Sequence, residues 1–304
     1  MSEIIAALES MFKEKGRGKV EMPPKPGIHT RKDAFIHAMA AHIPGLNVAG
    51  LKWVAGYPEN QKKNLPYVSG LLILNDPDTG FPVVLMDATW ITAKRTGAAT
   101  AVAAKYLARV DSSSAGIIAC GVQGRSNLEA LNSQFKLDKV KAYDVNHDNA
   151  VRFSQEMEEL IGVEIEVVNS AKEAVVNQDM VVTSGPILQR PSPVIEANWL
   201  AEGSFASPVD FDSYWTPAAL RQIDRLATDD IGQMNYYREL GYFKDTPEPF
   251  ADLGKLSLGE LPGRENDHQR TMSMNLGIAP DDMATAALIY KKAVEKNIGI
   301  WLEL

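Results

Sequence analysis

The segment from Ser114 to Asp144 constrains this chain most, because it reads in order as a strand, a glycine-containing turn, a helix and a strand that ends on an acid. The apolar strand at residues 116–120 leads into a turn whose glycines let the backbone approach a pyrophosphate, and the helix expected from Ser126 directs its amide dipole at those phosphates. Asp144 lies 20 residues beyond Gly124, where a carboxylate would accept hydrogen bonds from the adenosine ribose hydroxyls. The pattern predicts a dinucleotide-binding unit and favours NAD over NADP, because an acid repels a 2′-phosphate.

The turn departs from the usual three-glycine pattern, because Ala119 takes the first position, with Gly121 second and Gly124 third. Glycines after a strand also mark ordinary loops, so an α/β domain without a ligand is the alternative interpretation. The residues predicted to contact the cofactor belong to the turn, the acid and the end of a later strand: Ala119, Gly121, Val122, Gln123, Gly124, Asp144, Thr183 and Ser184.

The composition is that of a globular protein, with 45% hydrophobic and 23% charged residues. A chain of 304 residues exceeds what one core comfortably supports, so two domains are expected. The net charge of −8 argues against a broad surface for nucleic acid or anionic membranes, which would need clustered lysine and arginine. No stretch approaches the roughly 20 apolar residues that a membrane-spanning helix needs.

The single cysteine, Cys120, lies in an apolar strand and excludes an intrachain disulfide and a thiolate metal site. The five histidines show no metal-ligand spacing, so no metal is predicted. The N-terminus carries acids and helical periodicity instead of a basic leader. Together these features predict a cytoplasmic protein.

The order of the expected elements predicts an α/β fold. Strands and helices alternate from residue 115 to residue 183, which is typical of a parallel, doubly wound sheet. The first third is expected to form a small α+β unit, with a helix at 3–15, strands at 34–39, 46–56, 66–75 and 82–87, and a long helix at 89–108. Two more strands are expected at 204–211 and 223–227, a surface crossing without regular elements at 241–271, and a last helix from Pro280.

Two cationic side chains stand out in apolar surroundings. Lys52 lies in the apolar run 48–55, where a bound anion could compensate its desolvation, or where an edge strand could turn it to solvent. Arg95 shares a helix face with Ile91 and Val102, so its guanidinium is expected to point at packed surface. A substrate carboxylate and an internal salt bridge are the two interpretations of Arg95.

Asp210 and Asp212 are two residues apart near the end of an expected strand. Ligands of doubly wound sheets bind at the carboxyl edge, so either aspartate could act as a general base there. The alternative is a pair of solvated aspartates that leave the strand.

Four segments carry recognisable motifs in a specific order: LKWV and YPEN within residues 51–60, LMDATWITAKRTGAAT at 85–100, VQGRS at 122–126 and NLGIAPDDMA at 275–284. With these motifs the chain strongly resembles the ornithine cyclodeaminase/mu-crystallin family over nearly its whole length. The resemblance implies a Rossmann-type domain, 109–271, inserted into an α+β substrate-binding and dimerisation domain made of 1–108 plus 272–304. It also implies a homodimer that acts through an imine, with NAD(P), on the Cα–nitrogen bond of amino acids.

The resemblance assigns roles to particular residues. Lys52 is similar in position to a lysine that binds the substrate carboxylate and takes part in catalysis, and Arg95 to its partner arginine. Lys25 stands in place of a family arginine, so it keeps the charge and loses the planar fork. Asp212 falls at the position of the catalytic aspartate.

Departures from the family pattern bear on the substrate. Tyr67 stands where many members have a small hydroxyl residue, and His37 lies near the place of a glutamate that ornithine cyclodeaminases use. The loss of that glutamate favours a substrate with a shorter or apolar side chain.

We therefore expect an NAD-dependent oxidoreductase that acts on a small L-amino acid or its imine, of the alanine dehydrogenase or ketimine reductase type. One alternative is an ornithine cyclodeaminase, which forms proline and ammonia and recycles its NAD. Another is a protein that binds nucleotide and a small ligand without catalysis.

Overall fold

Two β-sheets of different type organise the structure, a computed structural model that describes residues 1–303 apart from the side chain of Gln61. The first sheet is antiparallel, with strand order β1-β2-β3-β4-β5. Its strands are β1 (Gly27–Ile28), β2 (Phe35–Ile43), β3 (Val48–Gly56), β4 (Val68–Asn75) and β5 (Pro82–Asp87). Two short 3₁₀ turns, Pro44–Leu46 and Pro58–Lys63, accompany it.

The second sheet is parallel, with strand order β12-β11-β13-β10-β9-β6-β7-β8. Its strands are β6 (Ser114–Ile118), β7 (Lys139–Tyr143), β8 (Ile165–Val167), β9 (Met180–Thr183), β10 (Phe205–Pro208), β11 (Arg225–Thr228), β12 (Ala251–Asp252) and β13 (Thr271–Met274). Helices α3 (Val122–Gln134), α4 (His147–Ile161) and α5 (Ala171–Val175) connect the strands β6 to β9. The predicted doubly wound parallel sheet is confirmed.

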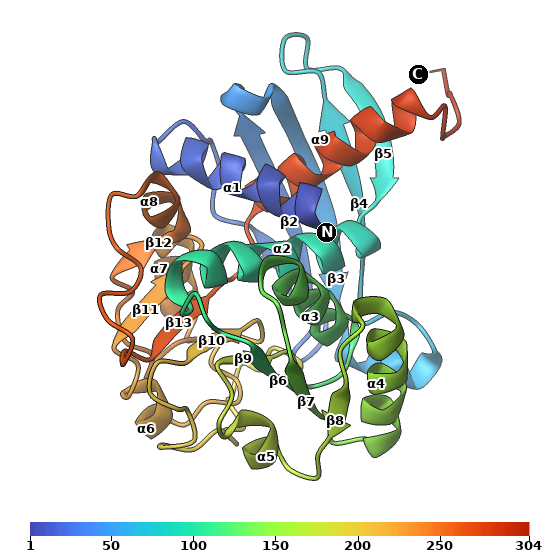
Figure 1. Ribbon diagram of the computed structural model, residues 1–304. Helices are drawn as coiled ribbons and strands as arrows, with labels where there is room; N and C mark the ends of the chain where they lie inside the picture. The colour runs from blue at the N-terminus through green and yellow to red at the C-terminus, as the bar shows by residue number, and fades with distance from the viewer. Residues whose placement is uncertain (304) are drawn as a thin grey trace.

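Helix α2 (Thr89–Leu107) runs between the two sheets (Figure 1) and is buried along most of its length. Its small residues allow close approach to α3. A Cβ on Gly97 would lie 2.3 Å from the carbonyl oxygen of Ser126, and the Ser126 hydroxyl donates to the Ala93 carbonyl at 2.6 Å. The alanine-rich sequence of α2 therefore serves helix packing, with side chains short enough for the two backbones to meet.

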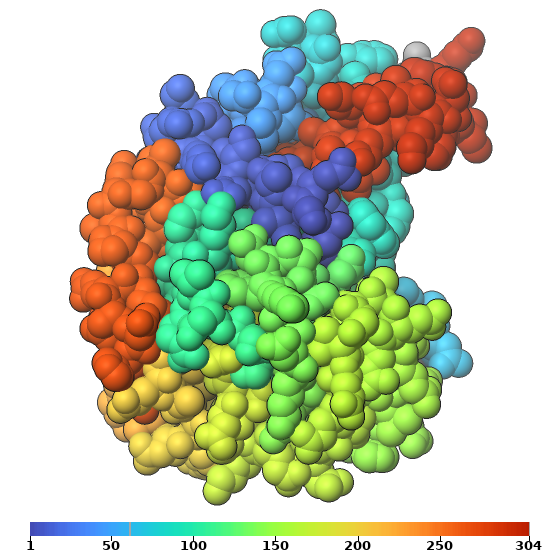
Figure 2. Space-filling view, viewed as in Figure 1, coloured from blue at the N-terminus to red at the C-terminus, as the bar shows by residue number. Residues whose placement is uncertain are grey.

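The two ends of the chain meet on the antiparallel sheet. Helix α1 (Ser2–Gly16) contacts α9 (Ala279–Glu295), and α9 packs on β2 and β3. Figure 2 shows the blue N-terminal and red C-terminal segments together at the top of the molecule. The division into 1–108 plus 272–304 and 109–271 stays a prediction; strand β13 extends to Met274 within the parallel sheet, past the predicted boundary at residue 271.

Three details of the sequence-based expectation were wrong. Helix α3 begins at Val122 instead of Ser126, directly after Gly121. Residues 241–271 hold regular structure, with β12 and α8 (Leu253–Leu258), which are too short to show periodicity. Helices α6 (Pro217–Leu220) and α7 (Ile231–Glu239) were not predicted. Within residues 1–303, no helix has the length and apolar character needed to cross a membrane.

Candidate functional site

A cavity of about 600 Å³ lies where the two sheets meet. Strands β2 and β3 and helix α2 line one side, and the segments after β9, β10 and β13 together with α7 line the other. Lys25, Lys52 and Arg95 all line this cavity. The structure thus brings together the three cations to which the resemblance assigned carboxylate binding.

Lys52 is fully buried on β3, which lies in the middle of the antiparallel sheet between β2 and β4. The solvent-facing edge strand, one of the two interpretations from the sequence, is therefore wrong. The Lys52 Nζ donates to Asp282 Oδ1 at 2.7 Å and to Thr92 Oγ1 at 3.3 Å. Burial, with help from the nearby Arg95 charge and against the attraction of Asp282, lowers the pKa of Lys52 to about 7.

Arg95 is 7% exposed and pairs with two aspartates at the start of α9. Its Nη1 lies 3.5 Å from Asp281 Oδ2, and its Nε lies 3.1 Å from Asp282 Oδ1. Gly277 makes room for the guanidinium, because a Cβ there would lie 2.3 Å from Nη1. Arg95 therefore has the internal salt bridge and also lines the cavity, and its binding of a substrate carboxylate stays a prediction.

Lys25 is held by the loop between β13 and α9. Its Nζ donates to the carbonyl oxygens of Leu276 and Gly277 at 2.9 and 3.0 Å. The amides of the same two residues donate to Asp229 at 3.0 and 2.6 Å. Burial, opposed by the Asp229 charge, lowers the pKa of Lys25 to about 8.

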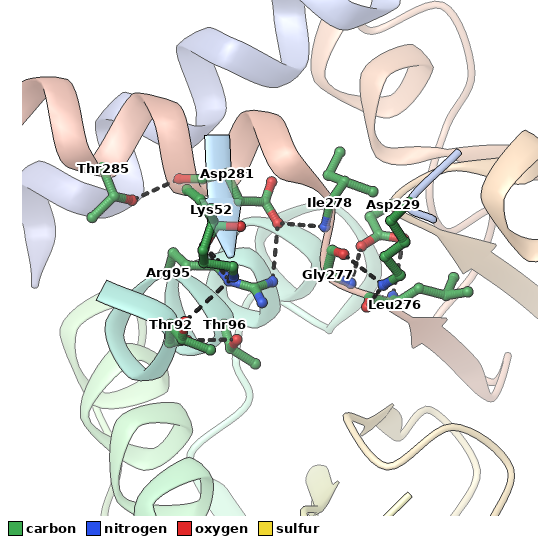
Figure 3. Close-up of polar contacts among 12 residues, drawn as sticks. Lys52, Thr92, Arg95, Thr96, Asp229, Leu276, Gly277, Ile278, Asp281 and Thr285 are labelled. Atoms are coloured by element: carbon green, nitrogen blue, oxygen red, sulfur yellow. Dashed lines mark hydrogen bonds and ion pairs between the residues drawn. The ribbon is translucent and has the colours of Figure 1, made fainter. Parts of the chain in front are cut away.

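Three buried aspartates thus accompany the three cations, namely Asp229, Asp281 and Asp282. Figure 3 shows Lys52 and Arg95 beside Asp281, with Asp229 next to Leu276 and Gly277. Sequence reasoning missed these acids, since Asp281 and Asp282 follow Pro280 and look like ordinary residues of a first helical turn. Their complete burial at a helix start is visible only in the fold.

Asp210 and Asp212 are 0% and 5% exposed, so the interpretation as solvated aspartates is wrong. Asp210 accepts from the Thr183 hydroxyl at 2.7 Å and from the Gly185 amide at 2.9 Å, and burial raises its pKa to about 7. Asp212 accepts from the Thr246 hydroxyl at 3.4 Å, and burial raises its pKa. Neither carboxylate is part of the cavity lining, although the intervening Phe211 is.

The turn between β6 and α3 has the geometry of a phosphate-binding loop. Ala119 adopts a left-handed conformation with φ of 69°, the conformation that a glycine adopts most readily. A Cβ on Gly121 would meet no atom within 4 Å, so open space faces the turn, whereas one on Gly124 would lie 2.6 Å from the Ala119 carbonyl oxygen. The second glycine therefore leaves room for a ligand, and the third allows the helix to pack on the strand.

The residues around the turn fit a dinucleotide. Asp144 accepts from the amides of Cys120 and Asn146, both at 2.8 Å, and lines a second hollow together with His147 and Val168. Gln123 lines the main cavity, and its buried Oε1 has no hydrogen-bond partner among the described residues. An extended cofactor could therefore run from the hollow at Asp144, past the turn, into the cavity.

The remaining residues that were predicted to contact the cofactor differ in how far they are exposed to the cavity or to solvent. Val122 is exposed at the start of α3. Ser184 lines the cavity and donates to the Ala119 carbonyl at 2.7 Å. Thr183 is fully buried, and its hydroxyl is engaged by Asp210 and by the Trp215 indole. The structure places Ser184 beside the turn and Thr183 behind it.

The part of the cavity around His37 carries little negative charge. His37 stacks on Phe35 with ring centroids 4.4 Å apart, and burial, reinforced by Lys25, His29 and Lys52, lowers its pKa to about 3. Tyr67 also lines the cavity, and Asp33 is the only acidic residue in the described lining. A cationic substrate side chain would therefore find few counter-charges here.

Comparison with known proteins gives a consistent result. The model of a family described as ornithine cyclodeaminase/mu-crystallin matches residues 1–297. The chain is 36% identical to an alanine dehydrogenase of Archaeoglobus fulgidus, over 98% of this chain and 92% of the relative. It is 31% identical to a Δ1-pyrroline-2-carboxylate reductase of Bacillus thuringiensis subsp. konkukian, over 100% of this chain and 95% of the relative.

Solved structures agree with these relatives. The Thermococcus litoralis Δ1-pyrroline-2-carboxylate reductase in complex with NADH and L-proline is 35% identical and superposes with a TM-score of 0.91, over 99% of this chain and 96% of that one. A dimeric archaeal alanine dehydrogenase with bound NAD is 35% identical, with a TM-score of 0.89 over 100% and 95% of the two chains.

Proposed function

This chain belongs to the ornithine cyclodeaminase/mu-crystallin family, and from that premise we propose that it is an NAD-dependent oxidoreductase acting on the Cα–nitrogen bond of a small L-amino acid or its imine. The observation that carries this proposal is the convergence of Lys25, Lys52 and Arg95 on a cavity beside the β6–α3 turn. NAD, when bound, would supply the hydride chemistry.

The three cations are proposed to bind the substrate carboxylate. Arg95 offers a planar fork that suits a carboxylate, while the two lysines act as point charges. Fixing the carboxylate in the cavity orients the Cα–hydrogen bond, which is the contribution that proximity makes to catalysis. Two of the cations sit on rigid elements, since Lys52 is on a central strand and Arg95 on a buried helix.

Lys52 and Asp212 are the proposed groups for proton exchange with the amine or with water at the imine carbon. The pKa of Lys52 is lowered by burial to about 7, which suits exchange near neutral pH. Asp212 has a pKa raised by burial, and its contact with Thr246 must break before the carboxylate can reach the cavity. The family resemblance supports Asp212 as the group that exchanges the proton, and the present geometry supports Lys52 in that role.

The test is the absorbance of NADH while the purified protein receives NAD with a panel of L-amino acids, or NADH with pyruvate plus ammonia or with cyclic imines. A sustained change with one substrate is expected. Lys52→Met should abolish turnover and leave NADH binding intact, whereas Asp212→Asn should lower turnover if that carboxylate exchanges the proton. Wild-type turnover in Lys52→Met would refute the role of Lys52 in the site, and wild-type turnover in Asp212→Asn would refute the role of Asp212.

An ornithine cyclodeaminase is the second candidate, and the neutral His37 with the scarcity of acids in the lining speaks against it. Its signature is proline and ammonia from ornithine without net change in NADH. If no assay shows a change in NADH absorbance or a product, the third candidate, a binding protein without catalysis, is favoured.

We also propose a cytoplasmic homodimer. The outer face of the antiparallel sheet exposes Trp53, Leu71 and Leu85, and Trp53 and Leu71 are directly paired neighbours on β3 and β4. Exposed apolar surface of this kind marks an interaction site. A second copy of the chain is the proposed partner, as in the dimeric archaeal relative.

A further inference from the structure

The buried acid Asp282 touches both central cations of the proposed carboxylate site. Its Oδ1 lies 2.7 Å from Lys52 Nζ and 3.1 Å from Arg95 Nε. Asp282 is fully buried and does not line the cavity, so it lies behind the cations as seen from the substrate. A single carboxylate oxygen therefore connects strand β3, helix α2 and helix α9.

This contact determines how the cations are presented. Lys52 has three ammonium hydrogens, of which Asp282 and Thr92 accept two, so one remains for a ligand in the cavity. Arg95 has five donors on a fixed plane, and contacts with its Nε and Nη1 set the direction of the remaining edge. Moving Asp282 would change the separation and direction of both cations at once.

We infer that Asp282 is a positioning residue for the reaction: it holds Lys52 and Arg95 in the arrangement that receives the substrate carboxylate. The inference rests on the proposed function, and it deepens that function by adding a residue that never touches the substrate.

The charges around Lys52 explain why Asp282 is needed. Arg95 on α2, Lys25 beside the β13–α9 loop and His37 on β2 all face the ammonium group without attracting it. Among the groups that shift the pKa of Lys52, Asp282 is the one that raises it, against burial and the cations. Loss of this acid leaves the ammonium in an apolar, cationic environment, where its proton is held less firmly.

The neighbouring Asp281 offers a matched control. It is equally buried, sits on the same helical turn, and lies 3.5 Å from Arg95 without a contact to Lys52. Burial, opposed by Arg95 and reinforced by the charges of Asp229 and Asp282, raises the pKa of Asp281. Asp281→Asn thus repeats the isosteric change at a similar depth without removing a contact to Lys52.

The experiment compares wild type, Asp282→Asn and Asp281→Asn by two measurements. The first is steady-state kinetics with the best substrate over a range of pH. Asp282→Asn is expected to raise KM for the amino or imino acid about 10- to 100-fold, the value of a lost charge-assisted contact. NADH affinity should stay unchanged. Activity that needs protonated Lys52 falls as pH rises, and in Asp282→Asn this fall should begin at lower pH.

The second measurement needs no turnover. NMR of protein labelled at its lysine side chains follows the titration of Lys52, whose signal is assigned by its absence in Lys52→Met. In Asp282→Asn the Lys52 midpoint should fall by about one pH unit or more, because an opposite charge at this distance is worth at least that. In Asp281→Asn the midpoint should fall less.

Each outcome is decisive. Equal effects of the two variants, or a wild-type KM and Lys52 midpoint in Asp282→Asn, would overturn the inference. If Asp282→Asn does not fold, as judged by loss of NADH binding, Asp282→Glu replaces it. In this variant the retained charge should preserve the titration midpoint of Lys52, while the displaced carboxylate should raise KM. A wild-type KM in Asp282→Glu would refute the positioning role. A wild type without turnover would count against the proposed function, and the titration would still test Asp282.

Discussion

Individual residues of the site show how burial and charge act together. Burial and the Arg95 charge lower the pKa of Lys52, and the Asp282 carboxylate, 2.7 Å from Nζ, opposes them. The resulting pKa of Lys52 is about 7. His37, which has cations and no acid beside it, has its pKa lowered to about 3 by burial and those charges. One cavity therefore holds a cation that can titrate near neutral pH and an imidazole that stays neutral.

The His37 imidazole predicts a pH dependence of stability. Its pKa is about 3 in the folded state and 6.5 as the reference value, so the unfolded chain binds more protons between these limits. The contribution of neutral His37 to the free energy of unfolding is therefore fully present above pH 6.5 and is lost as the pH falls toward 3. Urea unfolding at several pH values should show a shallower loss of stability in His37→Gln than in wild type. Parallel curves for the two proteins would mean that His37 is not held neutral.

Ala119 predicts a stabilising substitution. Its φ of 69° strains any residue with a Cβ. Ala119→Gly should raise the free energy of unfolding by about 0.5–1 kcal/mol, because the relief of strain exceeds the entropy that glycine adds to the unfolded chain. Urea unfolding measures the change, and the β-branched variant Ala119→Val should be less stable than wild type. A destabilised glycine variant would contradict the left-handed conformation.

At the scale of elements, the start of α9 does more than begin a helix. The β13–α9 loop supplies the Leu276 and Gly277 carbonyls to Lys25, and the first turn of α9 supplies Asp281 and Asp282 to Arg95. One short segment thus supports all three cations. Gly277 is a tight point of this arrangement, with φ of +74° and Arg95 Nη1 2.3 Å from where a Cβ would lie.

Gly277→Ala should therefore impair substrate binding. The added methyl displaces the Arg95 guanidinium, and KM for the amino or imino acid should rise about 10-fold or more, as expected for a weakened charged contact. The control is Gly80→Ala in the β4–β5 turn, which has the same φ of +74° and no atom within 4 Å of its Cβ. Both variants carry the same backbone strain, so a rise in KM only for Gly277→Ala assigns the effect to Arg95. A similar KM in both would contradict this role.

At the scale of the whole molecule, the cavity exists because two sheets of different type meet. The antiparallel sheet contributes Lys52 and His37 to the cavity, and the parallel sheet contributes the turn between β6 and α3 together with Ser184. Substrate and cofactor can thus be bound by separate units and still react at the boundary between them.

The proposed dimer is tested at this scale. Leu71→Glu combined with Leu85→Glu places two charges on the outer face of the antiparallel sheet, where both residues are exposed in the single chain. Light scattering after size exclusion should give a dimer for wild type and a monomer for the double variant, since buried unpaired charges disfavour an interface. Val110→Glu, at a position that is 98% exposed on the α2–β6 connection, should remain a dimer. A dimeric double variant would place the interface elsewhere.

Local patterns in the sequence determined the elements and the main cations. The alternation of strands and helices predicted the parallel sheet, the apolar run around Lys52 predicted a strand with an unusual cation, and the glycine turn with Asp144 predicted the nucleotide unit. These signals are local, since they depend on periodicity and on residues within one βαβ unit. The family resemblance then linked Lys25, Lys52 and Arg95.

Only the tertiary structure decided which acids lie near those cations. Asp229, Asp281 and Asp282 are far from Lys52 and Arg95 in sequence, and nothing in their immediate neighbours distinguishes them from exposed aspartates. Strand β13 was equally invisible, because a four-residue strand inside a sheet has no period to read. The insertion of β13 between β10 and β11 brings the start of α9 to the cavity, and that long-range placement creates the charge pairs on which the site depends.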